Sequence, residues 1–396
     1  MRLALIIDDY LPQSTRVGAK MFHELACELI AQGHSVTVIT PKDSQRQLLV
    51  KETLDNVSIW RFSSGKIKDV GKVKRAINES LLSFHAWRAI STEVTSNSFD
   101  AVVYYSPSIF FGSLVKKLKK RCRCSSYLVL RDLFPQWAVD AGMIRSGSLI
   151  EKYFRYFEHQ SYQQADTIGL MSERNVDVFK IENPQYPLQV LRNWASLVPC
   201  ALKTRKSYRE KLNLQDKVIY FYGGNIGHAQ DMTNLVRLAR NMQSYENVHF
   251  LFVGQGDEVE LINALSQQWQ LSNFSYLPSV DQEEFKQLLS EVDVGLFSLA
   301  SHHTAHNFPG KLLGYMVESL PILGSVNEGN DLRSLVNDAN AGFIHVNGED
   351  DALLASAVAL CTDCKLRVEM GNFAYKLLCD EFSVKAAVTT ILSEIN

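Results

Sequence analysis

Several features that the sequence lacks exclude whole classes of protein. The 396-residue chain has seven cysteines, an odd number that does not suit a disulfide-stapled secreted domain. Cys361 and Cys364 form one C-x-x-C pair without a second pair at zinc-ribbon spacing, so we interpret them as structural. No stretch approaches the roughly 20 apolar residues of a membrane span, and residues 3–7 are too short for a signal peptide. We therefore expect a cytoplasmic protein that at most rests on a membrane.

Motifs that hold metals or activate a serine are also missing. The sequence has no H-E-x-x-H, no D-x-D and no G-x-S-x-G, which argues against a zinc protease, a Mg²⁺-held nucleotide and an α/β-hydrolase. His302, His303 and His306 lie close together, but no carboxylate stands at matching spacing, so no metal is expected. The basic stretches contain no nucleic-acid recognition motif and the net charge is −2, so no nucleic-acid partner is expected either.

Charge is distributed unevenly along the chain. The first 200 residues contain 26 Lys and Arg against 19 Asp and Glu, whereas the remainder contains 15 against 24. A basic half suggests contact with something anionic, such as a phosphate-bearing substrate or a membrane surface. The basic residues gather in two stretches, one with Lys66, Lys68, Lys72, Lys74 and Arg75 ahead of Phe84 and Trp87, the other over 116–123. These stretches suit an interface with anionic lipid, and a solvated helix face explains them as well.

What the sequence does contain is a repeated alternation of short apolar runs and amphipathic stretches. The chain is too long for one core, since single cores stop growing at roughly 250–300 residues. The expected strands are 3–7, 36–40, 57–61, 101–105, 127–130, 167–171 and 188–191, then 218–222, 248–253, 274–277, 292–297, 321–323 and 343–346. This α/β alternation predicts two Rossmann-like domains with doubly wound parallel sheets, over 1–200 and 201–382. The polar stretch 203–211 is expected to connect them, and a helix is expected over 383–396.

The loop after the expected strand 218–222 is a candidate phosphate site. It contains Gly224, Asn225 and Gly227 and leads into a helix. Glycines there let backbone N–H groups approach an anion at the positive end of a helix. Gly254, in a G-x-G after the next expected strand, repeats this arrangement more weakly. A tight turn is the plainer explanation of these glycines.

A second candidate for binding phosphate is Pro309-Gly310-Lys311. Pro309 and Gly310 suit a turn into a helix, where Lys311 adds a positive charge to the helix N-terminus. Together these groups could neutralise a leaving diphosphate. The alternative is an ordinary solvated lysine. Leu312 stands where a Walker loop has Ser or Thr, so this is not a P-loop.

Taken in order, the segments 223–227, 252–256, 292–296 and 309–316 resemble the donor domain of glycosyltransferase family 4. The resemblance runs essentially the full length and includes Arg16-Val17-Gly18 and Gly33-His34. It implies the GT-B fold, in which two Rossmann-like domains face a cleft and a C-terminal helix crosses back to the first. It also implies sugar transfer with retention of configuration, from a UDP-sugar donor and without a metal or other cofactor.

A finer resemblance is carried by residues 131–137, 191–194 and 327–332. These segments are similar to those of bacterial O-antigen and capsule enzymes identified as N-acetyl-L-fucosamine transferases. Such enzymes act on saccharides linked to polyprenyl diphosphate. The resemblance therefore implies an N-acetylamino sugar donor, a lipid-linked acceptor and a peripheral position at the inner face of the cytoplasmic membrane.

Roles for individual residues follow from the resemblance and from the residue types. Lys311, the helix start after Pro309-Gly310 and the amides near Gly224–Gly227 would stabilise the departing diphosphate. The other expected donor contacts are Arg16, Gly18, Asn225, Gly254, Asn330 and Asp331, and the expected acceptor side holds Arg131, Asp132 and Trp137. Asp132 would orient the acceptor or assist removal of its proton. A cap role for Asp132 and a surface ion pair for Arg16 are the structural alternatives.

The sequence also departs from the family pattern. The family usually has two glutamates where this chain has His306 and Gly314, and the second normally holds the donor ribose. Glu318, one helical turn beyond Gly314, is a candidate substitute. Arg131 stands where the family often has a histidine. Two alternative functions stay open: a sugar-nucleotide 2-epimerase of the same fold, and a non-catalytic homologue that binds nucleotide-sugar.

Overall fold

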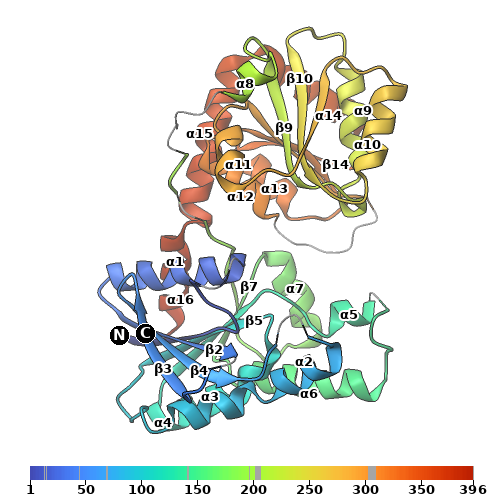
Figure 1. Cartoon of the computed structure of the whole chain (residues 1–396). Helices are drawn as coiled ribbons and strands as arrows, with labels where there is room; N and C mark the ends of the chain where they lie inside the picture. The colour runs from blue at the N-terminus through green and yellow to red at the C-terminus, as the bar shows by residue number, and fades with distance from the viewer. Residues whose placement is uncertain are drawn as a thin grey trace. The chain divides into compact units, whose positions relative to one another are not determined.

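The computed structural model describes residues 1–396 except 13, 15, 44, 68, 69, 141, 196, 201–206, 302–308 and 396, and the side chain of Lys72 is also not described. The chain divides into two compact units (Figure 1). Unit 1 comprises Met1–Arg192 and Val384–Asn396, and unit 2 comprises Asn193–Ser383. Unit 1 thus ends earlier than residue 200. The expected connection over 203–211 was wrong in its last part, because Tyr208–Lys211 forms a helix of unit 2, and residues 203–206 lie outside the described residues.

Unit 1 is built on an eight-stranded sheet of order β3-β4-β2-β1-β5-β6-β7-β8. Its strands are β1 Arg2–Ile6, β2 Ser35–Asp43, β3 Leu49–Leu54, β4 Val57–Ser64, β5 Ala101–Ser106, β6 Ser125–Leu130, β7 Thr167–Leu170 and β8 Leu188–Val190. All neighbours pair in parallel except β3 with β4. The sequence predicted every strand except β3, whose burial is only partial and which therefore has no continuous apolar run.

Helices surround this sheet, as Figure 1 shows. They are α1 Val17–Ala31, α2 Lys72–Ser80, α3 Leu82–Ile90, the short η1 Ile109–Phe111, α4 Gly112–Cys122, α5 Gln136–Asp140, α6 Leu149–Tyr162, α7 Glu173–Glu182 and α16 Val384–Ile395. On α1, the side chains of Phe22, Leu25 and Leu29 are buried. On α16, Val388 and Ile391 are buried and the helix contacts α1 and β6, so the C-terminal helix returns to unit 1.

Unit 2 is built on a six-stranded parallel sheet of order β11-β10-β9-β12-β13-β14. Its strands are β9 Val218–Asn225, β10 Val248–Gln255, β11 Phe274–Pro278, β12 Val294–Ser298, β13 Ile322–Val326 and β14 Gly342–Val346. Its helices are α8 Tyr208–Lys211, η2 His228–Gln230, α9 Met232–Asn241, α10 Val259–Gln268, α11 Gln282–Leu289, α12 Gly310–Val317, α13 Leu332–Asp338, α14 Asp350–Thr362 and α15 Cys364–Glu381.

The sheet of unit 2 carries a core on each face. Along β9, Phe221 belongs to one core cluster, while its neighbours Tyr220 and Tyr222 belong to the other. This follows from the alternation of side chains along a strand. Because both faces are covered, the strands are largely apolar, and polar groups gather in the loops at their carboxyl ends.

Candidate functional site

Two glycine loops at the carboxyl ends of β9 and β10 lie directly against one another. The strands pair in register, with Gly224 opposite Gly254. A Cβ atom on Gly254 would lie 1.8 Å from the carbonyl oxygen of Gly224, so no other residue fits at this position. Gly224 has a φ of +119°, a conformation that side chains rarely adopt. These glycines thus allow β9 and β10 to pack closely at their ends, and binding of an anion by their backbone N–H groups stays a prediction.

Lys311 extends its ammonium over this glycine loop. Pro309 forms the N-cap of α12, and Lys311 is the second residue of the helix. Its Nζ lies 3.7 Å from the centroid of the Tyr222 ring, and a Cβ on Gly224 would lie 3.7 Å from the same atom. The Nζ is covered and has no hydrogen-bond partner among the described residues. Burial lowers the pKa of Lys311 to about 7. Lys311 is thus not an ordinary solvated lysine, and its ammonium suits an anion that enters beside Gly224.

The carboxylate of Glu258, which was not predicted from the sequence, stabilises the turn that follows the Gly224 loop. Glu258 is buried, and one of its oxygens lies 2.8 Å from His228 Nδ1. Its other oxygen accepts a hydrogen bond of 3.2 Å from the backbone N–H of Met232, at the start of α9. Asp231, the N-cap residue of α9, makes no side-chain cap bond of its own. Glu258 therefore caps α9 from the next loop; only its place just after the G-x-G of β10 could have drawn attention to it.

Asn225 and Gly227 have local partners in this loop. The side-chain amide of Asn225 donates to Gln230 Oε1 at 2.9 Å, and Gly227 packs closely beneath Asp257, whose Oδ1 would be 2.6 Å from an added Cβ. Both residues shape the loop, and Gly224 and Asn225 are exposed on its outer side.

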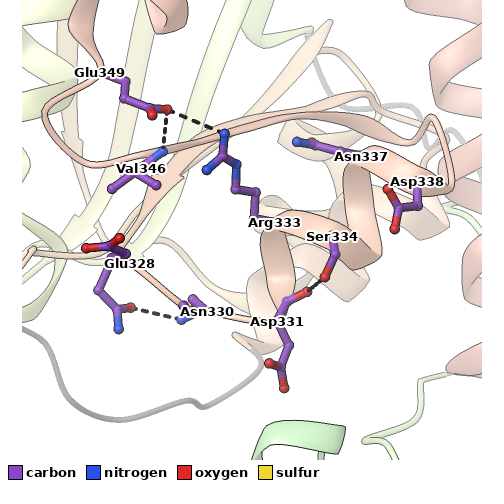
Figure 2. Close-up of a pocket in the computed structure, with 11 residues that line it drawn as sticks. Glu328, Asn330, Asp331, Arg333, Ser334, Asn337, Asp338, Val346 and Glu349 are labelled. Atoms are coloured by element: carbon purple, nitrogen blue, oxygen red, sulfur yellow. Dashed lines mark hydrogen bonds and ion pairs between the residues drawn. The ribbon is translucent and has the colours of Figure 1, made fainter.

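Asn330 and Asp331 line a second polar feature, a cavity of about 650 Å³ beside α13 (Figure 2). The Asn330 side chain accepts from the backbone N–H of Leu332 at 3.1 Å and donates to Asn327 Oδ1 at 2.9 Å. Asp331 stands at the N-cap position of α13. The lining also includes one cation, Arg333, whose Nη2 lies 3.8 Å from Glu349 Oε2. Carboxylates and amides predominate: Asn327, Glu328, Asn330, Asp331, Asn337, Asp338 and Glu349. Such groups suit the hydroxyls of a sugar better than a phosphate.

Glu318 lies away from the loop that it was expected to serve. It is the C-cap residue of α12, at the opposite end from Pro309, and its Oε1 accepts a hydrogen bond of 2.7 Å from the backbone N–H of Cys200. Burial raises the pKa of Glu318. Gly314 faces the core, where an added Cβ would lie 3.2 Å from Leu289 Cδ1. The structure therefore does not bring Glu318 together with Lys311 and the glycine loop.

In unit 1, Arg131 and Asp132 follow directly on β6. The guanidinium of Arg131 is buried, its pKa is lowered to about 10 by desolvation, and it donates to the carbonyl of Arg192 at 3.1 Å. Asp132 is an exposed residue overall, but its carboxyl group is partly buried. This burial raises the pKa of the carboxyl group. Trp137 on α5 is exposed and lies 5.9 Å from Phe134 between ring centroids. Arg131 thus anchors the loop, and Asp132 is the member of the pair that can meet a ligand.

Arg16 and Gly18 stand at the start of α1. The Arg16 Nε lies 3.9 Å from Asp9 Oδ2, and its side chain is largely exposed, which matches the surface ion pair considered above. Gly18 packs on Tyr105 of β5, whose hydroxyl would be 3.0 Å from an added Cβ. Burial raises the pKa of Tyr105, and the charges of Arg131, Asp8 and Asp132 also act on it. Gly18 and Asp132 therefore both lie near Tyr105.

The described part of the chain contains neither a metal cluster nor a membrane-spanning helix. No group of three or more His, Cys, Asp or Glu in this part of the chain is placed to hold a metal ion. His302, His303 and His306 lie outside the described residues, as do Asn307 and Phe308. Among the helices described, none has the length and apolar character that crossing a bilayer requires.

Comparison with known proteins finds a family similar to unit 2. Residues 204–377 match the sequence model of the family "Glycosyl transferases group 1". The matched residues lie in unit 2, which is therefore similar to the domain of this glycosyltransferase family. Unit 2 holds Lys311, both glycine loops and the cavity at Asn330.

Curated relatives of the chain are distant in sequence. A probable glycosyltransferase WbjE of Pseudomonas aeruginosa is 23% identical over 54% of this chain and 54% of its own length. A putative colanic acid biosynthesis glycosyl transferase WcaI of Escherichia coli is 24% identical over 75% of this chain and 76% of its own. The chain thus spans about half the length of the first relative and three quarters of the second.

Solved structures confirm the GT-B fold. The sucrose-phosphate synthase of Thermosynechococcus elongatus has a TM-score of 0.67 at 16% identity and covers 99% of this chain and 97% of its own. WaaG, a glycosyltransferase involved in lipopolysaccharide biosynthesis, gives 0.59 at 14% identity over 100% and 99%. Anabaena HepE, solved with UDP and glucose, gives 0.63 at 12% identity over 99% and 98%. At these identities the likeness concerns the fold alone.

Proposed function

We propose that the chain transfers a sugar from a UDP-sugar to a saccharide acceptor in the assembly of a bacterial surface polysaccharide. One observation carries this proposal: the covered ammonium of Lys311, unpaired among the described residues, stands over the Gly224 loop at the start of α12. An unpaired buried cation is costly, and a diphosphate would balance it. The names of WbjE, WcaI and WaaG support surface polysaccharide or lipopolysaccharide as the setting.

In the proposed reaction, the bond between the anomeric carbon and the donor diphosphate breaks, and the acceptor oxygen forms a bond to that carbon. The acceptor hydroxyl loses its proton and the diphosphate leaves with the bonding pair. Lys311 and the first amides of α12 stabilise the charge that develops on the leaving diphosphate. Asp132 in unit 1 orients the acceptor hydroxyl or takes up its proton. The reaction retains anomeric configuration and needs no metal.

The finer parts of the proposal concern both substrates. The carboxylates and amides of the cavity at Asn330 and Asp331 accept and donate hydrogen bonds to the hydroxyls of the donor sugar. We propose an N-acetylamino sugar, of the N-acetyl-L-fucosamine type, as that donor. The acceptor is a saccharide on a polyprenyl diphosphate, which places the enzyme at the inner face of the cytoplasmic membrane.

A thermal-shift titration with UDP, GDP, UDP-GlcNAc and NADH tests the donor side. A ligand present at 100 times its Kd adds about 2.7 kcal/mol of apparent stability. We expect a rise with UDP and UDP-GlcNAc, none with NADH, and loss of the UDP response in Lys311→Ala. Absence of any nucleotide response would contradict the proposal. Product formation from UDP-sugar alone, without acceptor, would instead indicate a 2-epimerase, and binding without turnover would indicate a non-catalytic homologue.

A further inference from the structure

Unit 1 exposes an apolar stripe along α2 and α3. Leu81 joins the two helices in a helical conformation, so positions 73, 77, 81 and 84 fall on one side at helical spacing. Val73, Ile77, Leu81 and Phe84 occupy these positions, and each side chain is between 41 and 76% exposed. Stripes of this kind normally face a core, yet this one faces outward.

A second row of exposed apolar side chains adjoins the first on α6. Leu149, Ile150, Tyr153 and Tyr156 are between 42 and 83% exposed. The hydroxyl of Tyr153 is hydrogen-bonded to Ser80 Oγ at the end of α2, which fixes the two rows side by side. We refer to these eight side chains together as the α2–α6 face.

Aromatic packing extends this surface to Trp137. The rings of Tyr153 and Phe154 are 5.4 Å apart, those of Phe154 and Phe134 are 4.8 Å apart, and Trp137 stands beside Phe134. Trp and Tyr are the residues that gather at the level of lipid headgroups, because their rings are apolar and carry one polar atom.

Positive charge surrounds the α2–α6 face. The described cations exposed along 66–88 and 142–156 are Lys66, Lys74, Arg75, Arg88, Arg145 and Lys152. In the same described residues the carboxylates of Glu79 and Glu151 are mostly covered and are paired with Arg75 and Arg155. Asp69 lies outside the described residues. Arg75 is thus paired, and Asp140, near Trp137, is an exposed carboxylate. The described residues of these segments nevertheless combine outward apolar groups with an excess of exposed cations over exposed carboxylates.

We propose that the α2–α6 face docks unit 1 onto an anionic lipid bilayer. Apolar side chains enter the boundary between headgroups and acyl chains, and the flanking Lys and Arg contact lipid phosphates. A second copy of this chain is a less suitable occupant. In a two-fold dimer the same surface of both copies is in contact, so the exposed Lys and Arg of one copy would face those of the other. This inference rests on the proposed function only in that a lipid-linked acceptor gives the docking a use.

The second basic stretch, on α4, has a different character. Lys117 and Arg121 lie over the Trp87 ring, 5.7 and 5.1 Å from its centroid, and together they line a cavity of about 750 Å³ with Lys120 and Arg123. The large apolar residues of α4, Leu114, Val115 and Leu118, are buried. This helix therefore offers cations to a lipid surface but no large apolar side chain for insertion. The α4 stretch therefore serves as a control for charge without apolar insertion.

Co-sedimentation of the full chain with phosphatidylcholine vesicles, with and without phosphatidylglycerol, tests the inference. We expect binding to the phosphatidylglycerol vesicles that weakens as salt rises. Ile77→Asp/Phe84→Asp should lose about tenfold or more of this binding, because two inserting groups become charged. Ile181→Asp, at an exposed apolar residue on α7, should bind like the unchanged chain. Both substituted sites are on the surface, and matching thermal melts check that the variants fold.

Three results would overturn the proposal. One is an unchanged chain that does not bind phosphatidylglycerol vesicles. Another is binding that survives Ile77→Asp/Phe84→Asp but is abolished by Lys120→Glu, which moves the membrane contact to α4. The third is a dimer in sedimentation velocity that Ile77→Asp/Phe84→Asp dissociates. Calorimetry with UDP on the same samples separates the two proposals: UDP binding without vesicle binding defeats the docking face alone, and vesicle binding without UDP binding defeats the proposed function alone.

Discussion

The ammonium of Lys311 lies 3.7 Å from the centroid of the Tyr222 ring. Tyr222 lies in the buried part of β9, and its hydroxyl donates a hydrogen bond to the carbonyl oxygen of Asn225 in the glycine loop. The side chain of Tyr222 thus contacts the ammonium of Lys311 with its ring and the glycine loop with its hydroxyl. A cation over an aromatic face keeps some stabilisation when water is excluded, so the pair places a positive charge beside Gly224 before any ligand is bound.

Replacement of Lys311 by alanine should therefore reduce turnover about 100-fold or more, because a group that stabilises leaving-group charge is lost. Steady-state kinetics with a UDP-sugar and a lipid-linked or synthetic acceptor measure this effect. Lys376→Ala, at an exposed lysine of α15, is the matched control and should retain the full rate. Near-normal turnover of Lys311→Ala would remove Lys311 from the reaction.

The pKa of Lys311 predicts how stability depends on pH. The folded pKa of about 7 lies below the ordinary 10.5, so the unfolded chain binds more protons between these values. Stability from this group therefore rises as pH increases from about 7 toward 10, by at most about 1.4 kcal/mol per pH unit. Thermal melts of the chain and of Lys311→Met across this range should differ in slope. Parallel pH profiles would show that Lys311 is not desolvated.

Affinity for the donor should show the opposite trend with pH. A bound diphosphate favours the charged lysine, so donor binding takes up a proton at pH values above about 7 and weakens as pH rises. Calorimetry with UDP-GlcNAc in two buffers of different ionisation enthalpy detects this uptake at pH 8. A heat that does not depend on the buffer would contradict proton-linked binding.

Much of the fold, but less of the site, could be predicted from the sequence. The parallel strands are continuous apolar runs, because both sheet faces are buried, and such runs are visible without a structure. The edge strand β3 is only partly buried and has no such run, so it was missed. The sequence indicated a lipid interface near the α2–α6 face through its basic residues and Phe84. It did not reveal the exposed apolar stripe, because an apolar stripe at helical spacing has the same pattern whether it faces a core or solvent.

The site residues also divide into those whose positions could be predicted from the sequence and those whose positions could not. Gly224, Gly254 and Lys311 follow strands or open a helix, and the topology of parallel sheets brings such positions together. Glu318 was chosen by helical spacing alone, and spacing does not reveal that its carboxylate meets Cys200. Glu258 acts through the backbone N–H of another element, a long-range contact that has no signal in the sequence.

Glu258 offers a test of how the loop is positioned. Glu258→Ala removes the cap of α9 and the partner of His228, so we expect a loss of about 1–2 kcal/mol in stability. The KM for the donor should rise more than kcat falls, because the loop that is proposed to hold the diphosphate loses its support. Glu258→Gln keeps an acceptor for Met232 N–H and should recover part of both. The exposed neighbour Glu260 provides the control, and equal effects in Glu260→Ala would refute this role.

Asp132 is predicted to act on the acceptor alone. Asp132→Asn keeps the shape of the side chain but removes its charge, so kcat should fall about 10²-fold or more while donor binding by unit 2 is unchanged. In the unsubstituted enzyme, activity should fall as pH decreases through the raised pKa of this carboxyl, because the carboxylate is the working form. The pH–rate profile of Asp132→Asn should lack this acidic limb. Donor affinity that falls together with kcat would show instead that Asp132 supports the donor or the fold.

The last prediction concerns the contact between the two glycine loops. In Gly254→Ala the new methyl would lie 1.8 Å from the Gly224 carbonyl oxygen, so the ends of β9 and β10 must separate. We expect a loss of about 1–3 kcal/mol or more in stability and, because Gly224 moves relative to Lys311, a weaker response to UDP. Gly71→Ala in unit 1, where an added Cβ meets nothing within 4 Å, should leave both unchanged. If Gly254→Ala bound UDP normally, the close approach of these loops would serve only the packing of the sheet.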